Sequence, residues 1–337
     1  MIQEAIQAVV EGQDLSADQA ASAMDGIMSG EATPSQFGAF VTALRMKGET
    51  VDEIAGMAQV MRDKSVRVQV AGNVIDTCGT GGDNSGSFNI STTAAFVVAG
   101  AGEKVAKHGN RSMSGSTGSA DVLEALGVKI DLTPESVARC IDEVGFGFMF
   151  AQGFHPSMRF AAGPRREIGI RTVFNILGPL TNPANASRQL IGVADPSTAE
   201  RMARVLGQLG SEKALVVHGS DGMDELTITG PSTVWQLENG EVSSYEFSPE
   251  ELGFSLSDAD SIRADGPEDS ARIARAVLSG EPGPARLVVL LNAAAALVAA
   301  GSADTLSAAI HIAARSIDTG QAMDRLDALI DLTESLE

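Results

Sequence analysis

The chain has 337 residues, of which 44% are hydrophobic, and a formal net charge of −20. This length predicts two domains, or one domain with an added lobe. The acidic charge argues against nucleic acid as the main partner, because a phosphate backbone needs a broad basic surface. The most apolar stretch, Leu287 to Ala300, is too short to cross a membrane and contains Asn292. Two cysteines, Cys78 and Cys140, and an N-terminus unlike a secretory signal favour a cytoplasmic protein with reduced thiols.

The first 66 residues are predicted to form short helices. Three of them begin with a capping box, at Ser16–Gln19, Thr33–Gln36 and Thr50–Glu53. Their apolar faces need a partner, either the rest of the chain or a second copy. We therefore expect a small all-helical unit and, through it, a homodimer.

After residue 73, short β-rich runs alternate with helical stretches, which predicts a mainly parallel sheet flanked by helices. The segment Val234–Phe247, with Asn239–Gly240 at its centre, is typical of a β-hairpin at a sheet edge. The Arg-rich segment His155–Leu180 interrupts this alternation and is expected to fold back onto the helical unit. The expected strands are Val74–Thr77, Lys104–Lys107, Phe146–Phe150, Leu190–Val193 and Leu215–His218, and the expected helices are Thr92–Ala99, Asp121–Leu126, Pro134–Val144 and Ser197–Leu209.

Charge is unevenly spread along the chain. Residues 100–188 hold 10 Lys and Arg against 8 Asp and Glu, whereas both flanking regions are acidic. A slightly positive segment in an acidic protein would receive an anionic ligand. Chance clustering is the alternative explanation.

Two glycine- and hydroxyl-rich segments follow the first strand. The sequence DTCGTGGD (Asp76–Asp83) is suited to a phosphate-binding nest of backbone N–H groups, but it matches neither a dinucleotide-binding motif nor a P-loop. The alternative is an ordinary strand-to-helix turn. Asn89-Ile90-Ser91-Thr92 precedes an apolar helix, where the residues could simply cap the helix or could bind an anion and Mg²⁺.

Two further segments carry charge. KHGNRS (Lys107–Ser112) places three cation-capable groups together, which suits phosphate oxygens, and the hydroxyl-rich loop up to Asp121 could bind a second phosphate. A solvated surface loop is the alternative. The adjacent Asp224 and Glu225 repel one another unless a cation lies between them, and oxygen ligands favour Mg²⁺. A solvated acidic turn is the alternative there.

A basic helix is predicted after His155. One of its arginines facing a cleft would suit an aromatic carboxylate, with His155 beside the ring. Helix-face salt bridges to Glu167 are the alternative. The arginines are Arg159, Arg165, Arg166 and Arg171.

Taken together, these segments resemble the anthranilate phosphoribosyltransferase family. The resemblance runs from IMSGEATPSQFGAFVTALRMKGET through DTCGTGGD, FNISTTAAFV, KHGNRS, GSAD and IRTVFNILGPLTNP to HGSDGMDELTITGPS, in this order and over nearly the whole chain. It implies a small helical dimerisation domain of residues 1–70 with roughly 160–185, and a large α/β domain of residues 71–159 and 186–337 that carries the donor and magnesium sites.

The resemblance also implies an activity and a set of site residues. The enzyme would transfer the 5-phosphoribosyl group of 5-phosphoribosyl 1-diphosphate to the amine of anthranilate, releasing diphosphate, in tryptophan biosynthesis. Lys107 and His108 are the candidate catalytic groups, in a reaction driven mainly by positioning and electrostatics. Two Mg²⁺ ions per subunit would bind Ser91, Asp224 and Glu225, and anthranilate would contact Gly79, His108, Asn110, His155 and Arg165. The donor would contact Gly79, Gly82, Asp83, Ser87, Asn89, Ile90, Ser91, Thr92, Lys107, His108, Gly109, Asn110, Arg111, Ser112, Met113, Ser114, Gly115 and Ser119.

The chain departs from the family pattern at two places. Gly115, Ser116 and Thr117 replace Ser, Lys and Ser, which removes one cation near the phosphates, and Gln152-Gly153 replaces the more usual Pro-Ala. Two rival readings remain. A pyrimidine nucleoside phosphorylase shares the fold, but it carries a KHSTGG-like loop in place of KHGNRS and needs no diphosphate–magnesium site. A non-catalytic relative that binds nucleic acid is disfavoured by the charge.

Overall fold

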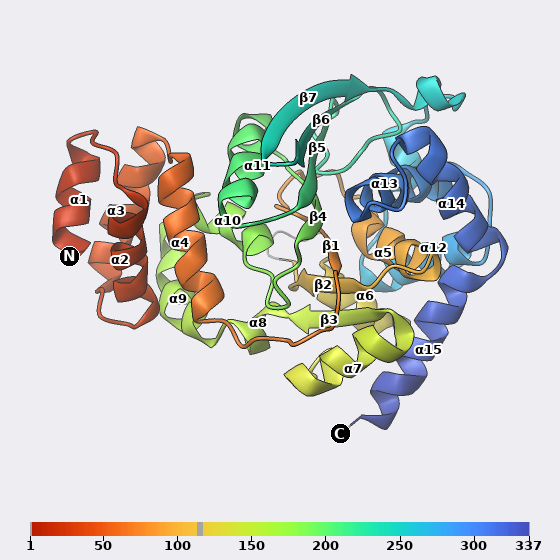
Figure 1. Ribbon diagram of the computed structural model, residues 1–337, viewed down its shortest axis with the longest axis horizontal. Coiled ribbons are helices and arrows are strands. Elements are labelled where there is room, and N and C mark those ends of the chain that lie inside the picture. Colours follow the sequence, from red (N-terminus) through yellow and green to blue (C-terminus); the bar gives the residue numbers. More distant parts are fainter. Residues whose placement is uncertain (1, 113–116, 337) are drawn as a thin grey trace.

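The N-terminal helices form a separate bundle in a computed structural model that describes residues 2–112 and 117–336. Each of the three expected capping boxes forms; for example, the Ser16 hydroxyl accepts a hydrogen bond from the Gln19 amide, and the Gln19 side chain accepts one from the Ser16 amide. The bundle lies at one end of the molecule's longest axis (Figure 1). Its helices are α1 (Ile2–Val10), α2 (Ala17–Met28), α3 (Pro34–Lys47) and α4 (Val51–Asp63).

The rest of the chain is built on one seven-stranded sheet of order β3-β2-β1-β4-β5-β6-β7. The first five strands of this order are parallel, and β6 and β7 add an antiparallel hairpin at the edge. The hairpin turns at Asn239 and Gly240, both with positive φ, as a tight two-residue turn requires. The strands are β1 (Ile75–Gly79), β2 (Val105–Gly109), β3 (Phe146–Phe150), β4 (Arg188–Gly192), β5 (Lys213–Gly219), β6 (Ser232–Glu238) and β7 (Glu241–Phe247).

Helices cover both faces of the sheet, and alternate residues of a strand face different cores. Leu215 and Val217 of β5 pack into one apolar cluster, whereas Ala214 and Val216 pack into another. The first cluster includes α5 (Ile90–Gly100), α6 (Ser119–Leu126), α12 (Pro267–Leu278), α13 (Pro284–Ala300), α14 (Leu306–Asp318) and α15 (Gln321–Ser335), and the second includes α11 (Ala199–Gln208). The fold class is therefore as predicted, and the expected parallel strands and their helices agree with the observed bounds within two residues.

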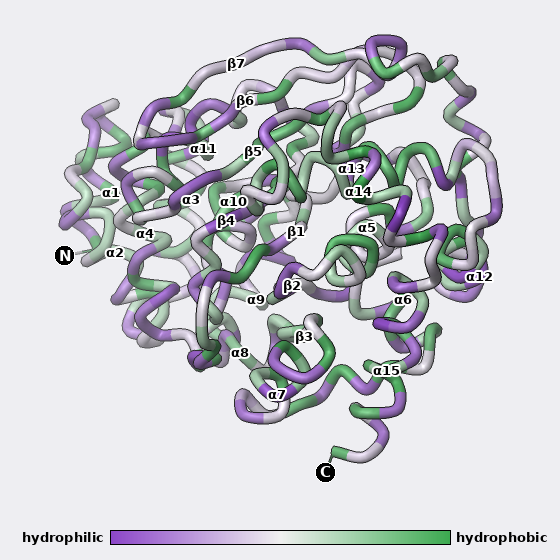
Figure 2. Tube along the Cα trace, turned by 45° about the vertical axis from the view of Figure 1, so that its right-hand side comes forward, coloured by the Kyte–Doolittle hydropathy of each residue, from purple (hydrophilic) through white to green (hydrophobic). Residues whose placement is uncertain are grey.

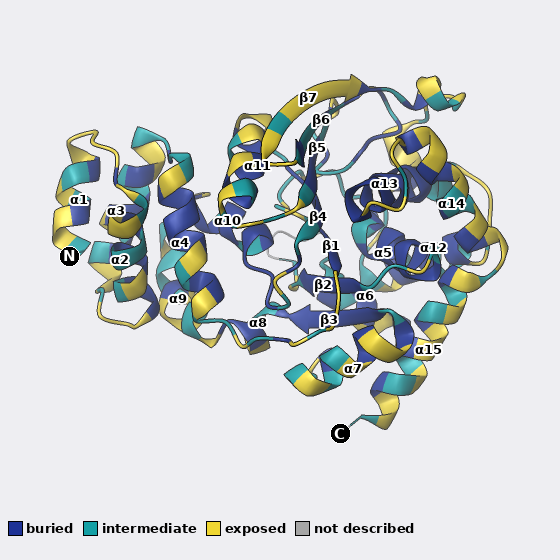
Figure 3. Cartoon of the chain, viewed as in Figure 1, coloured by how far each residue is buried: buried dark blue, intermediate teal, exposed yellow. Residues whose placement is uncertain are grey.

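Burial follows the layers. The inner helix α13 is dark blue over most of its length in Figure 3, and every residue from Val288 to Ala300 is buried. The outer helices α7 (Pro134–Val144) and α15 alternate between hydrophilic and hydrophobic stretches in Figure 2, as amphipathic helices do. Among the residues described, no helix combines the length and apolar character that a membrane crossing requires.

A short helical insertion packs against the N-terminal bundle. It consists of α8 (Ala151–Phe154), α9 (Arg159–Ile168) and α10 (Phe174–Leu177). The Phe174 ring lies 5.2 Å from that of Phe37 in α3, and Ala161 of α9 joins the same apolar cluster. Because this cluster continues to α11 and to one face of the sheet, the bundle and the α/β part share a core.

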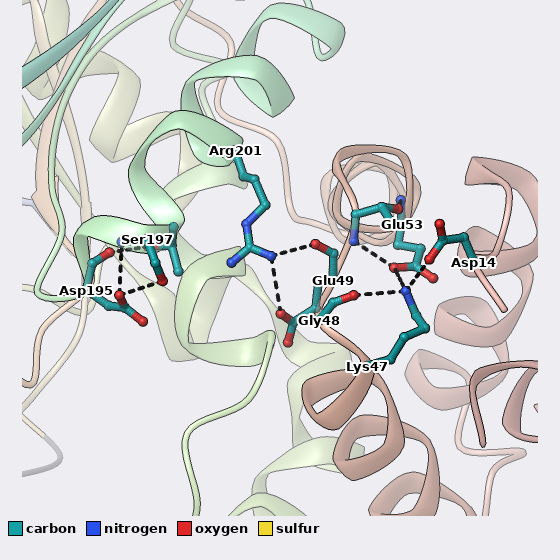
Figure 4. A network of polar contacts seen from close by, with 10 residues as sticks. Asp14, Lys47, Gly48, Glu49, Glu53, Asp195, Ser197 and Arg201 are labelled. Atoms are coloured by element: carbon teal, nitrogen blue, oxygen red, sulfur yellow. Dashed lines mark hydrogen bonds and ion pairs between the residues drawn. The ribbon is translucent and has the colours of Figure 1, made fainter. Parts of the chain in front are cut away.

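Two arginines fix the bundle to the α/β part. Arg62 of α4 is buried and donates to the carbonyls of Leu180 (2.7 Å) and Leu209 (3.1 Å). Arg201 of α11 donates to the Glu49 carbonyl at 2.7 Å (Figure 4). Close to this contact, the Lys47 ammonium group bonds to Asp14 and Glu53 within the bundle. In both arginine contacts a charged guanidinium group donates to backbone carbonyls where the bundle meets the α/β part.

Candidate active site

The candidate site lies where the loops after the parallel strands β1, β2 and β5 meet the start of α5. In parallel sheets these loops share the edge at the carboxyl ends of the strands, which is where such folds bind ligands. The glycine loop 79–83 follows β1, the segment 109–112 follows β2, and the acidic loop 220–231 follows β5. The topology thus brings together segments that are distant in the sequence; Gly81 and Asp224, which are in contact, are 143 residues apart.

The glycine loop closes directly on Asp224. The Gly81 amide donates to the Asp224 carboxylate at 2.8 Å. A Cβ on Gly79 would lie 2.2 Å from a carboxylate oxygen of Asp224, and one on Gly192 would lie 1.5 Å from its backbone oxygen. Only glycine fits at these positions, so the glycines serve this close approach as well as the turn.

The start of α5 faces the neighbouring carboxylate. Asn89 is the N-cap, and its side chain accepts from the Thr92 amide at 3.0 Å. The capping residue is thus Asn89, while Ser91 is in the first helical turn. The Ser91 amide lies close enough to Glu225 to lower the pKa of that carboxyl, although burial raises it more. The positive end of the helix dipole therefore meets Glu225.

The acidic loop is held in shape by residues that do not face the site. Asp221 accepts hydrogen bonds from the hydroxyls of Thr227 (2.6 Å) and Thr229 (2.8 Å). Asn292, the polar residue within the apolar helix α13, exchanges two 2.9 Å hydrogen bonds with the backbone of Leu226. These contacts fix Asp224 and Glu225 in position.

The carboxylates at this site are costly to ionise. Burial, followed by the charge of Asp83, raises the pKa of Asp224 to about 6, and burial, followed by the charge of Asp224, raises the pKa of Glu225 well above its usual value. A cation among the three groups would remove this repulsion. Across residues 2–112 and 117–336, no group of three or more His, Cys, Asp or Glu has the geometry of a complete metal site. Mg²⁺ commonly takes only one or two carboxylates and fills its sphere with water and substrate phosphates.

Lys107 is completely buried beneath these groups. Its ammonium group donates to the Thr77 carbonyl and lies 3.3 Å from the Ser91 hydroxyl. Burial lowers the pKa of Lys107, and the nearby charge of Asp76 opposes this effect. Asp76 is itself buried and accepts from the His108 amide (3.2 Å) and the Asn182 side chain (2.8 Å). Asp76 and Asn182 thus hold β2 in place at the site. The sequence patterns did not reveal this role.

The segment after β2 folds onto the start of α6. A Cβ on Gly109 would lie 2.0 Å from the Ser119 hydroxyl, so the two residues pack closely. Asp121 accepts from the amides of Ser112 (3.0 Å) and Gly118 (3.1 Å) and pairs with Arg111. Arg111 also pairs with Glu124, so its charge is neutralised within the chain. The predicted donor contacts Met113, Ser114 and Gly115 lie outside the described residues.

Two buried imidazoles that were predicted to contact the acceptor, His108 and His155, lie close to each other. The rings of His108 and His155 lie 4.9 Å apart, and the Nε2 atoms of both are buried without a hydrogen-bond partner. Burial lowers the pKa of His155 to about 4, and burial together with the His155 ring lowers that of His108 well below its usual value. Both rings are therefore neutral at pH 7. Arg165 of α9 is half-buried over the Phe174 ring at 5.5 Å, and burial lowers its pKa.

The structure brings most of the predicted site residues to one region, with exceptions. The Ile90 side chain is in the apolar core, and the Thr92 hydroxyl is buried without a partner, so neither side chain is open to a ligand. The prediction that Arg171 belongs to the basic helix is wrong, because α9 ends at Ile168 and Gly169 follows with φ of +67°. That glycine is the signal that could have marked the helix end.

Comparisons with known proteins agree with this architecture. Residues 3–65 match the description "Glycosyl transferase family, helical bundle domain", and residues 71–323 match "Glycosyl transferase family, a/b domain". The fold and site thus define a glycosyl transferase of this two-part type.

Individual relatives narrow the family. The chain is 59% identical to the anthranilate phosphoribosyltransferase of Moorella thermoacetica over 99% of both chains. It is 41% identical, with a TM-score of 0.93 over 98% of this chain and 99% of the other, to the crystal structure of that enzyme from Thermus thermophilus. The Saccharomyces cerevisiae enzyme, solved in complex with PRPP and Mg, is 27% identical with a TM-score of 0.91 over 99% of this chain and 98% of the other. The chain belongs to the anthranilate phosphoribosyltransferase family.

Proposed function

We propose that this protein transfers the 5-phosphoribosyl group from 5-phosphoribosyl 1-diphosphate to the amine of anthranilate. The observation that carries the proposal is the meeting of the Gly81 amide, the first turn of α5 and the pair Asp224–Glu225 in one place. Backbone donors, a helix N-terminus and paired carboxylates together suit a diphosphate bound with magnesium.

The donor side would bind and polarise the leaving group. The glycine loop and the first turn of α5 would contact the diphosphate through backbone amides, and the Gly81 amide, which donates to Asp224 in this structure, would then exchange this partner for a phosphate oxygen. Lys107 supplies a buried positive charge next to Ser91, although its ammonium also holds the Thr77 carbonyl. As the C1–O bond breaks, its electron pair moves to the diphosphate, and these donors stabilise the growing charge.

Magnesium fits the residues present. Asp224, Glu225 and the Ser91 hydroxyl would bind it, and a bound cation would offset the burial and mutual repulsion that raise the pKa of both carboxylates. When bound, the metal would neutralise charge on the departing diphosphate. We propose two ions per subunit.

The acceptor side would orient anthranilate without changing its protonation. Its amine is nucleophilic when neutral and forms the N–C1 bond as the diphosphate leaves. The nitrogen then releases one proton to the diphosphate or to water, so the neutral His108 and His155 need not act as strong bases. Arg165 would bind the carboxylate, and its low degree of solvation strengthens such a pairing. Catalysis is then mainly the positioning of two substrates, which can contribute up to about 7–11 kcal/mol.

We further propose that residues 1–70 with roughly 160–185 form the dimerisation domain of a cytoplasmic homodimer. Val10 and Met46 of the helical bundle are 65% and 83% exposed, and a partner bundle would cover such apolar side chains. Sedimentation at micromolar concentration tests this, and a monomer would contradict it.

One assay tests the reaction. Anthranilate fluorescence is followed with 5-phosphoribosyl 1-diphosphate, with and without Mg²⁺, in parallel with ribose 1-phosphate as an alternative donor. Fluorescence should fall only with the diphosphate donor and magnesium. Turnover with ribose 1-phosphate alone, or with neither donor, would contradict the proposal.

A further inference from the structure

Arg171 reaches the glycine loop 79–83 from the helical insertion. Its backbone lies between α9 and α10, in the segment that packs against the helical bundle. A Cβ placed on Gly82 would lie 1.8 Å from Nη1 of Arg171 and 3.1 Å from its Cζ. The guanidinium group therefore rests directly on the backbone of Gly82, in space that any other residue at that position would fill.

The base of this side chain is anchored although its tip is exposed. Gly169, with φ of +67°, ends α9 and turns the chain, and the Thr172 amide donates to the Asn175 side chain at 2.9 Å. Thr172 and Val173 are buried directly after Arg171. The backbone that carries Arg171 is thus fixed, which limits where its guanidinium can reach.

The guanidinium of Arg171 makes no ion pair and no side-chain hydrogen bond within the described ranges 2–112 and 117–336. Several arginines of this acidic chain are paired within the chain, as Arg111 is with Asp121 and Glu124, and Arg201 with Glu49. Arg171 differs from the other arginines without such partners in these ranges, for example Arg166, because its guanidinium lies against the glycine loop. Five N–H donors at the surface of a glycine loop are therefore available to an anion that the loop binds.

We propose that Arg171 is a donor-binding residue that contacts the diphosphate group held by the glycine loop. This inference rests on the proposed function. Its charge would add to the backbone amides of the loop from the side of the helical insertion, and it could pair with phosphate oxygens in a bidentate manner. Arg165 and Arg171, six residues apart, would then serve different substrates: Arg165 the acceptor and Arg171 the donor.

Calorimetric titration with 5-phosphoribosyl 1-diphosphate and with inorganic diphosphate, each with Mg²⁺, tests this assignment. Arg171→Ala should raise both dissociation constants about 10- to 100-fold, as the loss of a charged hydrogen bond does. Arg171→Lys should lie between the wild type and Arg171→Ala, because lysine keeps the charge but not the fork. The Michaelis constant for anthranilate should change less than about threefold.

Arg166→Ala is the matched control, because Arg166 is an exposed arginine of the same insertion. It should bind both ligands within about twofold of the wild type. If Arg171→Ala keeps the wild-type thermal midpoint and also binds within about twofold, Arg171 is not a donor contact. If the wild type itself neither binds the donor nor consumes anthranilate, the proposed function fails instead.

Discussion

The region proposed to bind the donor and the region proposed to bind the acceptor differ in their electrostatics. On the proposed donor side, Asp83, Asp224 and Glu225 repel one another. The hydrogen-bond partners of the buried Lys107 within residues 2–112 and 117–336 are neutral oxygens of Thr77 and Ser91. On the acceptor side, two imidazoles are kept neutral, and each leaves a nitrogen without a partner.

This difference indicates how each side recognises its ligand. The proposed donor side combines carboxylates that repel one another with backbone donors from the glycine loop, so it suits a metal–phosphate ligand. The acceptor side offers neutral polar atoms and one poorly solvated guanidinium, so it suits a flat molecule with one carboxylate. The predictions below test this division.

Removing the charge of the acidic pair should have the largest effect. Asp224→Asn with Glu225→Gln should lower magnesium-dependent turnover at least about 1,000-fold, because charge on the leaving diphosphate is no longer neutralised. Folding should be unchanged, since repulsion between the two groups is relieved. Turnover and circular dichroism measure the two effects, and substantial activity in this variant would show that the pair does not bind the metal.

Adding a methyl group to the glycine loop should also lower activity severely. Gly79→Ala places a Cβ 2.2 Å from the Asp224 carboxylate, which has to move. The value of kcat/KM should fall about 100-fold or more, the scale that misplaced catalytic groups produce. Gly26→Ala in α2, where nothing lies within 4 Å of the added atom, is the control and should keep full activity.

Arg165→Ala should separate the two substrates. The Michaelis constant for anthranilate should rise about 10- to 100-fold, while that for the donor changes little. Steady-state kinetics with each substrate varied in turn gives both values. An equal rise in both constants would show that Arg165 does not specifically bind anthranilate.

The smallest effect concerns stability and pH. The lowered pKa of His155, about 4, means that the folded state resists protonation while the unfolded state accepts it near pH 6.5. Stability is thus lost as pH falls below about 6.5, by about 2 kcal/mol at pH 5. His155→Gln should lose less stability than the wild type between pH 8 and pH 5 in denaturant titrations. Equal losses would mean that His155 does not titrate as described.

Local signals predicted much of the fold. The capping boxes at Ser16, Thr33 and Thr50 and the turn at Asn239–Gly240 each depend on contacts within a few residues, which a sequence displays directly. Strand-to-loop motifs likewise pointed to Asp224, Glu225 and the glycine loop, because parallel strands end at a shared edge.

Contacts between residues far apart in the sequence could not be predicted from local patterns. The buried pair Asp76–Asn182 joins residues 106 positions apart, and the Arg171 guanidinium lies against Gly82 of the glycine loop. Arg111 was expected to meet a ligand phosphate, but Asp121 and Glu124 engage it in the structure. No local pattern indicates which of several partners a long side chain selects.

A crystal structure with 5-phosphoribosyl 1-diphosphate and Mg²⁺ is the most direct test of the central claim. We expect the diphosphate between the glycine loop and the first turn of α5, with magnesium bound to Ser91 and to at least one of Asp224 and Glu225. A diphosphate bound elsewhere, or a metal that contacts none of these three residues, would contradict the account.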